Sequence, residues 1–312
     1  MIYEVLPVHL QIEPCQLCNL NCLGCSIRDV HKKEKRGILT LDDFKILISH
    51  SPSVNDISLH GLGEPFFNND LSKIAILLNN KGIVARTVTN GNVINPNIDS
   101  KVMLENLKEI CFSIDGDDKN TYETIRSDGD FDKFKKVVSS FSEAKAKGNF
   151  MSCLLSFNCI ISKINIDNVS GIPALAKELG IDKVIFNFMG QFYYSKKDDN
   201  YKMVEEIRNL DTKSLLSLME MLSNECGKLE IEISYPAIGK KRHYDCFWPI
   251  RAAFVTAEGY VTPCNYRMNP KELSFGNLLT QTMEEIWLSK RYLDFRKNYY
   301  EKNYYDFCLT CS

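Results

Sequence analysis

Short apolar runs rich in β-branched and aromatic residues recur through the first two thirds of the chain. Such runs, bounded by turn residues, are typical of buried strands. Strands are predicted at Val8–Glu13, Asp56–His60, Val84–Thr89, Glu109–Ile114, Leu154–Ile161 and Lys183–Met189.

Between these runs, apolar residues recur at the three- and four-residue spacing of amphipathic helices. Helices are predicted at Leu41–Ser49, Asp70–Asn79, Pro96–Glu105, Asp132–Lys147 and Ile166–Glu178. Thr40 stands at an N-cap position, and Gly82, Gly148 and Gly180 fall where helices are expected to end. Strands alternating with helices predict repeated βα units and a parallel sheet. Because ligands of parallel α/β barrels bind at the carboxyl ends of strands, residues just past each strand are the first candidates for a site.

Composition and charge narrow the classes of partner. The chain has 312 residues, 44% apolar content, a formal net charge of −2 and a pI near 6.3, so charge provides no general attraction to nucleic acid or membranes. Apolar runs such as Val184–Met189 are far shorter than the roughly 20 residues that cross a bilayer. No export signal opens the chain, so we expect a cytoplasmic protein with reduced thiols. The basic run at residues 32–36 is interpreted as a solvated loop.

Three cysteines at C-x3-C-x2-C spacing, Cys18, Cys22 and Cys25, follow the first predicted strand. Three thiolates can hold three irons of a [4Fe–4S] cluster and leave the fourth iron open, whereas a fully ligated cluster takes four cysteines. Cys15 adds a second interpretation, because Cys15–Cys18 and Cys22–Cys25 form two C-x2-C pairs that suit a zinc knuckle.

Polar turns follow the next three strands. The first is His60-Gly-Leu-Gly63-Glu64-Pro65, which does not match the dinucleotide motif because Phe66 occupies its last glycine position. Its glycine-lined carboxylate suits an ammonium group instead. Thr89-Asn90-Gly and Ser113-Ile-Asp115-Gly follow the next two strands. A calcium loop after Asp115 is excluded, because Asn120 stands where an EF-hand needs glycine.

A second set of cysteines lies near the C-terminus: Cys246, Cys264, Cys308 and Cys311. Cys264 follows a predicted hairpin around Gly259, and the last two form a C-x2-C pair. Spacing alone fits one zinc ion or one [4Fe–4S] cluster equally well.

The order of these motifs resembles that of the radical S-adenosylmethionine (SAM) enzymes. The resemblance implies that Cys18, Cys22 and Cys25 hold a SAM-binding [4Fe–4S] cluster and that Gly63, Glu64 and Pro65 hold the amino group of SAM. It also implies further SAM contacts from Thr89, Asn90, Ser113 and Asp115, with Arg126 pairing with the SAM carboxylate.

The C-terminal motifs, from Cys246-Phe-Trp-Pro to the closing C-x2-C, resemble the short twitch form of the SPASM domain. This implies one auxiliary [4Fe–4S] cluster held by Cys246, Cys264, Cys308 and Cys311. Since the sequence ends at Ser312, we expect two clusters in total. The predicted fold is a partial (β/α)6 TIM-type barrel over residues 1–235 followed by a twitch domain over 236–312.

In such enzymes a 5′-deoxyadenosyl radical abstracts hydrogen from substrate, and the auxiliary cluster can accept an electron. The cysteine layout and the His-x-x-Gly-Glu-Pro turn resemble the aminocyclitol dehydrogenases of butirosin biosynthesis. We therefore expect an oxidoreductase that oxidises a sugar or cyclitol alcohol and takes electrons from flavodoxin or ferredoxin, with no nucleic-acid or membrane partner. Candidate substrate residues are His60, Asn158, Asn187, Arg251 and Tyr266.

Two alternatives stay open. One is a maturase that epimerises or crosslinks a ribosomal precursor peptide, with Cys111, Cys153 or Cys159 as a hydrogen donor. The triplet's position at Cys18 leaves no room before it for a peptide-recognition domain, which counts against this alternative. The other is a zinc-stapled binding module without catalysis, which leaves Glu64 and the other strand-end polar residues unexplained.

Overall fold

The computed structural model describes residues 4–25, 37–188, 212–238 and 246–309. The chain forms two compact units, each built from separate segments of sequence. Unit 1 comprises Met1–Leu17, Glu34–Thr87 and Lys241–Ser312, and unit 2 comprises Cys18–Lys33 and Val88–Lys240. Of the two cysteines in the closing C-x2-C pair, Cys308 is among the described residues and Cys311 lies outside them.

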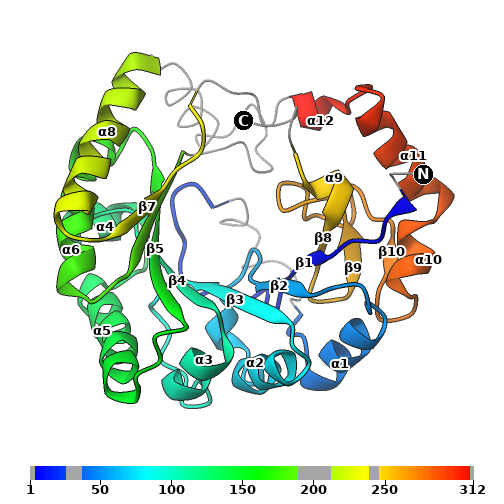
Figure 1. The fold of residues 1–312 in the computed structure, drawn as a ribbon, viewed down its shortest axis with the longest axis horizontal. Coiled ribbons are helices and arrows are strands. Elements are labelled where there is room, and N and C mark those ends of the chain that lie inside the picture. The colour runs from blue at the N-terminus through cyan, green and yellow to red at the C-terminus, as the bar shows by residue number, and fades with distance from the viewer. Residues whose placement is uncertain (1–3, 26–36, 189–211, 239–245, 310–312) are drawn as a thin grey trace. The chain divides into compact units, whose positions relative to one another are not determined.

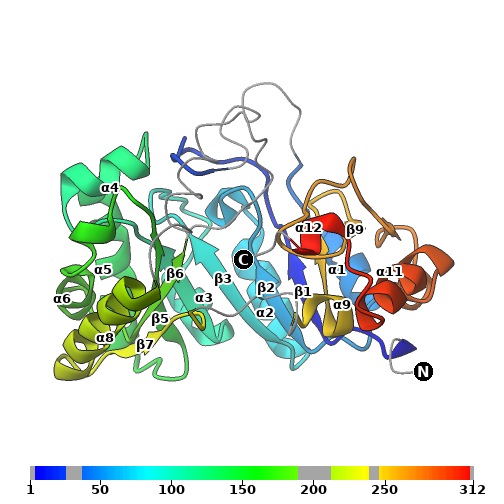
Figure 2. The ribbon, with the colours of Figure 1, turned by 90° about the horizontal axis from the view of Figure 1, so that it is seen from above.

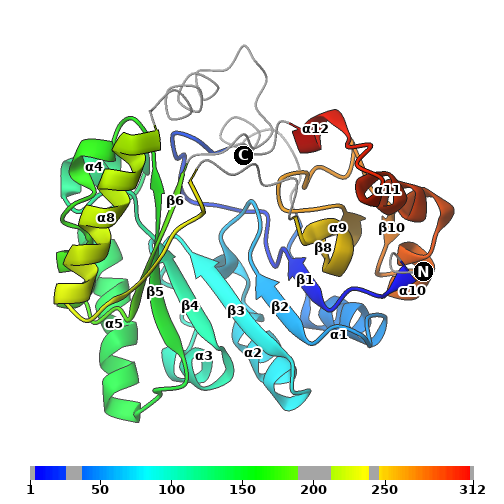
Figure 3. The same cartoon turned by 45° about the horizontal axis from the view of Figure 1, so that its top comes forward.

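Unit 1 contains a mixed sheet in which β1, β2, β3 and β8 are parallel (Figure 3). Strands β9 and β10 are antiparallel to their neighbours. Strand β1 lies between β2 and β8, so the N-terminal strand pairs with a strand from the C-terminal segment. The strands are β1 (His9–Ile12), β2 (Asp56–Leu59), β3 (Val84–Thr89, which runs on past Thr87 into the segment of unit 2), β8 (Ala252–Val255), β9 (Tyr260–Thr262) and β10 (Gly276–Asn277).

The helices of unit 1 begin at well-defined caps. Thr40 caps α1 by accepting from the backbone N–H of Asp43, and Thr282 and Glu285 form a reciprocal capping box on α10. The helices are α1 (Leu41–Ser49), the 3-10 turn η2 (Pro65–Phe67), α2 (Leu71–Asn80), α9 (Trp248–Arg251), α10 (Met283–Trp287), α11 (Lys290–Tyr300) and α12 (Asp306–Leu309) (Figure 1).

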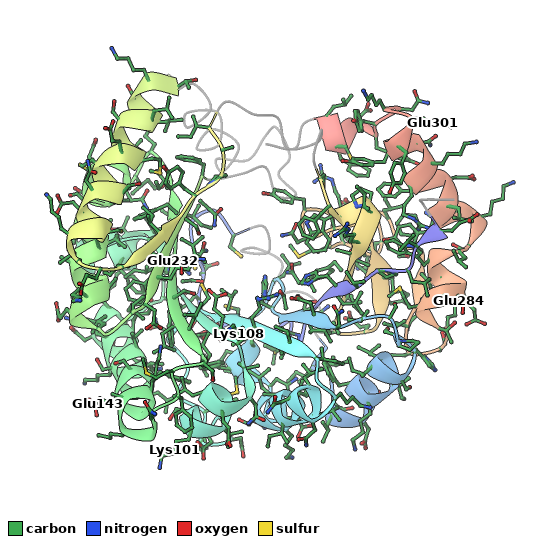
Figure 4. The ribbon with its side chains drawn as sticks, in the orientation of Figure 1. Lys101, Lys108, Glu143, Glu232, Glu284 and Glu301 are labelled. Carbon is green, nitrogen blue, oxygen red and sulfur yellow. The ribbon has the colours of Figure 1, made fainter. Side chains whose placement is uncertain are left out.

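Unit 2 contains four parallel strands, and α5, α6 and α8 lie on one side of β5–β7 (Figures 1 and 2). Phe112, Phe134 and Phe157 are buried in its core. Lys101 and Glu143 lie on the outer helices α3 and α5 (Figure 4). The elements are α3 (Ser100–Asn106), β4 (Glu109–Ser113), α4 (Lys119–Ile125), α5 (Phe131–Gly148), β5 (Leu154–Ile161), η3 (Ile166–Asn168), α6 (Ile172–Glu178), β6 (Lys183–Phe188), α8 (Thr212–Lys228) and β7 (Glu232–Ser234).

The expected α/β class with a mostly parallel sheet is confirmed, and two predicted helices are corrected. The helix predicted from Pro96 begins at Ser100, because the Asp99 side chain accepts from the N–H groups of Lys101 and Val102 and so sets the N-cap. The helix predicted over Ile166–Glu178 is divided into η3 and α6. No helix in the described segments is long and apolar enough to cross a membrane.

Candidate active site

The loop that carries Cys18, Cys22 and Cys25 belongs to unit 2. Backbone hydrogen bonds tie it to the end of α4: Asn21 N donates to Ser127 O (2.9 Å) and Leu23 N donates to Ile125 O (2.8 Å). Within the loop, Cys25 N donates to Cys22 O (3.2 Å). The three-thiol loop is therefore held by backbone contacts of the folded chain.

Cys15 has a different environment. It is fully buried, its Sγ accepts from Leu17 N (3.3 Å), and burial raises the pKa of its thiol to about 11. A buried thiol that shapes its own turn fits a packing role better than a ligand role. This supports the triplet reading over two paired C-x2-C motifs.

The Thr89-Asn90-Gly91 turn lies against the cysteine loop. Asn90 Nδ2 donates to Asn19 Oδ1 (2.9 Å) and to Cys18 Sγ (3.7 Å). The buried Thr89 hydroxyl accepts from Gly91 N (3.1 Å), so it serves the turn itself. Asn19 was not a sequence candidate. The one available signal was its place directly after a predicted ligand.

Asp115 and Arg126 form a buried ion pair beside Cys22. Arg126 Nη2 lies 2.8 Å from Asp115 Oδ2, and Asp115 Oδ1 accepts from Ile160 N (2.8 Å). Both carboxylate oxygens of Asp115 are thus engaged inside the protein. Arg126 Nε is buried and has no partner among the described residues. Burial raises the pKa of Cys22 to about 11, and the positive charge of Arg126 opposes this rise.

Ser113 ends β4 and is paired in register with Asn158 of β5. Asn187 Nδ2 on β6 donates to Asn158 Oδ1 (2.7 Å). These three uncharged polar side chains come from three successive strands. Cys111, Cys153 and Cys159 are buried, and burial raises the pKa of each thiol, which fits packing roles for all three.

In unit 1 the Gly61-to-Pro65 turn packs tightly on the backbone that follows β1. A Cβ on Gly63 would lie 2.2 Å from the carbonyl oxygen of Cys15, so no larger residue fits. Glu64 N donates to Leu17 O (2.7 Å). The buried Glu64 carboxylate accepts a hydrogen bond from Phe66 N (3.0 Å), so Glu64 is the N-cap of η2.

Glu13 supports the same turn and was not a sequence candidate. Its Oε1 accepts from Leu62 N (2.7 Å), and a Cβ on Gly61 would lie 2.5 Å from its side chain. Burial raises the pKa of Glu13 to about 6, with a smaller contribution from the negative charge of Glu258. The sequence signal was a carboxylate closing an apolar strand.

His60 follows β2 and is held as the neutral imidazole at neutral pH. Burial lowers its pKa to about 4, and the positive charges of His9 and Arg86 act in the same direction. Its Nδ1 is buried and has no hydrogen-bond partner in the described part of the chain.

Two of the C-terminal cysteines lie around one tyrosine. Tyr299 Oη accepts from Cys246 N (3.0 Å) and donates to Cys246 O (3.1 Å). Burial raises the pKa of Tyr299 to about 12, and the thiols of Cys246 and Cys308 add to the rise. Cys264 begins a tight turn closed by Arg267 N, which donates to Cys264 O (3.1 Å).

The remaining candidates are less enclosed. Tyr266 lies half-buried in the turn that begins at Cys264, and Arg251 ends α9 with an exposed side chain. Across the described ranges, no three Cys, His, Asp or Glu side chains meet as a metal-binding group, so both cysteine sites stay predictions.

Comparison with known proteins bears directly on the C-terminal cysteines. Residues 246–312 match the SPASM family, described as an iron–sulfur cluster-binding domain. The AdoMet-dependent heme synthase of Methanosarcina barkeri is 26% identical over 286 residues, covering 86% of this chain and 79% of the relative. These comparisons confirm the resemblance to the radical SAM superfamily and its SPASM-domain subgroup.

Solved structures support the same fold. Streptococcus suis SuiB bound to its precursor peptide SuiA is 16% identical at a TM-score of 0.73, and the match covers 98% of this chain and 70% of SuiB. BtrN in complex with AdoMet and 2-DOIA is 16% identical, and the match covers 99% of this chain and 94% of BtrN. Its TM-score of 0.48 is too low to support an argument about the reaction.

The residues present fit the cofactors of a radical SAM enzyme. Soft thiolates are the usual ligands of iron–sulfur clusters, and Cys18 already receives an N–H donor of the kind that such ligands accept. Gly63 has no side chain, so the turn to which the resemblance assigns SAM can approach the backbone of Cys15 closely. Arg126 presents a buried N–H with no partner among the described residues, which suits an incoming carboxylate.

Proposed function

We propose that this SPASM-domain radical SAM enzyme oxidises an alcohol of a small polar metabolite, a sugar or cyclitol, and that an auxiliary cluster accepts one electron. The observation that carries the proposal is the placement of Cys246 and Cys308 around Tyr299 within the matched iron–sulfur domain. An electron acceptor distinguishes net oxidation from a redox-neutral rearrangement.

The ligands we propose are Cys18, Cys22 and Cys25 for a SAM-binding [4Fe–4S] cluster and Cys246, Cys264, Cys308 and Cys311 for one auxiliary [4Fe–4S] cluster. When bound, SAM and its cluster supply a 5′-deoxyadenosyl radical that abstracts a hydrogen atom. The number of auxiliary clusters is part of the proposal.

The chain's own residues have defined tasks in this scheme. The resemblance assigns the ammonium group of SAM to Glu64, beside Gly63 and Pro65, and the carboxylate of SAM to Arg126, which would bind it in a charge-assisted pair. Thr89, Asn90, Ser113 and Asp115 shape the surroundings of the cofactor. Since both oxygens of Asp115 are engaged internally, it contributes mainly by holding Arg126 in place.

Oxidation of a secondary alcohol to a ketone removes one hydrogen atom, one proton and one electron. When bound, SAM would supply the group that takes up the hydrogen atom, and an auxiliary cluster held by the C-terminal cysteines would take up the electron. We assign the first acceptance of the proton to His60, whose buried Nδ1 has no hydrogen-bond partner in the described part of the chain. Because burial lowers its pKa to about 4, His60 would pass the proton on rather than keep it. Asn158 and Asn187 offer amide groups to substrate hydroxyls, and Arg251 and Tyr266 are candidates for its polar groups. A one-electron donor such as flavodoxin or ferredoxin would supply the electron that reduces the SAM-binding cluster.

The first experiment is a count of iron, sulfide and zinc on anaerobically reconstituted protein, wild type against the Cys18→Ala/Cys22→Ala/Cys25→Ala variant. About eight irons falling to about four is the expected result for two cubane clusters. About four irons falling to none, with zinc retained, would remove the electron acceptor and contradict the oxidation mechanism.

A second candidate is modification of a precursor peptide, because SuiB, which shares the fold, has been solved with such a peptide. The 26% identical relative points the other way, since its name describes formation of a small molecule, heme. The two candidates are separated by measuring 5′-deoxyadenosine release with sugars and cyclitols and, separately, with precursor peptides. Stoichiometric release of deoxyadenosine and ketone with a cyclitol supports oxidation. Release with a peptide alone, without ketone, supports the maturase.

A further inference from the structure

The amide of Asn90 makes two contacts with the loop that carries Cys18. Its Nδ2 donates to Asn19 Oδ1 at 2.9 Å and to Cys18 Sγ at 3.7 Å. A primary amide has two N–H groups, so it can serve both acceptors at once. A separation above 3.5 Å is usual for a hydrogen bond to the larger sulfur atom.

The orientation of this amide follows from its third contact. Asn90 Oδ1 accepts from the backbone N–H of Asn92 at 2.7 Å, so the oxygen points to the backbone and the nitrogen to the cysteine loop. The side chain is 7% exposed and is held by a turn in which Gly91 has φ +66°. The N–H that faces Cys18 is therefore set by the fold.

The turn is anchored from behind as well. Asn92 Nδ2 donates to Tyr122 Oη (2.6 Å), and Asn92 Oδ1 accepts from Asp130 N (2.8 Å). Asn19 Nδ2 returns a hydrogen bond to Asn92 O (3.2 Å), which closes the link between the turn and the cysteine loop. Because these contacts already hold the Asn90 amide in place, little further conformational entropy is lost when it bonds to a charged Cys18 sulfur.

We propose that Asn90 tunes the cluster bound by Cys18: its N–H stabilises the electron-rich thiolate and makes the cluster easier to reduce. Hydrogen bonds to cluster sulfurs and local charge set the potentials of iron–sulfur centres. The bond strengthens when the thiol becomes a thiolate, because charge-assisted hydrogen bonds are stronger than neutral ones. This inference rests on the proposed function, in which Cys18 is a cluster ligand.

The test is an EPR-monitored redox titration of the full, reconstituted chain without SAM. The cluster at Cys18 is identified in parallel samples as the one whose signal changes when SAM is added. Asn90→Ala removes the donor. Asn90→Asp removes the donor, keeps the acceptor for Asn92 N–H and adds negative charge. Tyr122→Phe is the matched control. It removes the hydroxyl that contacts Asn92 Nδ2 and Asn90 O, but it keeps the Asn90 amide and the Asn92 N–H that orients this amide.

The expected result is a more negative midpoint potential for Asn90→Ala, a still more negative one for Asn90→Asp and no change for Tyr122→Phe. Wild-type potentials in both Asn90 variants with full iron content would overturn the proposal. Loss of this cluster from both variants would also overturn it, because the role would then be assembly. A wild-type protein with no SAM-responsive signal would instead contradict the proposed function.

Discussion

At the scale of single residues, the buried carboxylate of Glu13 has a measurable consequence for stability. Its pKa is raised to about 6 by burial, so the folded state binds a proton more readily than the unfolded state does. The free energy of unfolding therefore decreases as pH rises from about 4.5 through 6, the opposite of the trend for an ion-paired carboxylate.

Glu13→Gln removes this titration and keeps an oxygen for Leu62 N–H. We expect the variant to be more stable than wild type by up to about 2 kcal/mol at pH 7–8 and to show a flatter dependence on pH. Urea unfolding at pH 5 and pH 8 provides the measurement. A variant that loses more stability at pH 8 than at pH 5 would show that the charged form is needed for the turn.

Gly63 permits a different kind of prediction, based on space. An alanine Cβ there would meet the backbone of Cys15 and Gln16, at 2.2 Å from the carbonyl oxygen of Cys15, so the turn has to shift. We expect Gly63→Ala to cost about 1–3 kcal/mol of stability and to weaken SAM binding.

Gly227→Ala is the matched control for this change. Gly227 lies in α8, and a Cβ there would meet nothing within 4 Å. Alanine should raise stability by up to about 1 kcal/mol, because glycine is a poor helix former. Equal effects of the two substitutions in urea unfolding would contradict the steric argument.

At the scale of elements, local patterns were sufficient for most of the regular structure. The strands at Val84–Thr89 and Leu154–Ile161 and the helix at Leu41–Ser49 have the predicted bounds, because short apolar runs and a threonine cap are local signals. Cap chemistry that competes with periodicity was missed, as at Asp99. Neither β7 nor the amphipathic α8 was predicted. Strand β7 has only three residues, so its sequence signal is weak.

The same division holds for the candidate site. Glu64, Asn90 and Asp115 could be selected from their places after strands, and the structure puts Asn90 beside Cys18 and Asp115 beside Arg126. That Asp115 uses both carboxylate oxygens internally could not be predicted, because one of its partners, Ile160 N, is a backbone group distant in sequence. Glu13 was missed for a similar reason, since its role depends on the backbone of Leu62.

At the scale of the whole molecule, the two ends of the sequence meet within unit 1. Strand β8 pairs with β1, and Trp287 Nε1 donates to Val5 O at 2.8 Å. Trp287 is fully buried, and the Arg296 guanidinium lies 4.0 Å from the centre of its ring. Folding of the C-terminal segment is therefore coupled to the strand that precedes the cysteine loop.

Trp287→Ala should lower the free energy of unfolding by about 3–5 kcal/mol, because it removes a large buried side chain. Trp248 then stays as the only tryptophan, since the chain has two, and reports on unit 1. We expect the fluorescence of Trp248 and the far-UV circular dichroism of the whole chain to change together in urea. An early fluorescence transition, with β-sheet signal retained, would show that the C-terminal segment unfolds alone.

The two hydrogen bonds between the Tyr299 hydroxyl and the backbone N–H and C=O of Cys246 also bear on how the protein matures. In small zinc domains the metal drives folding, because no site exists before it binds. In the proposed function Cys246 is a cluster ligand, and its backbone is held by contacts of the polypeptide: the Tyr299 hydroxyl accepts from its N–H and donates to its C=O. The position of this ligand would then depend on α11 as well as on iron, so assembly of the cluster would respond to a substitution in α11 that touches no cysteine.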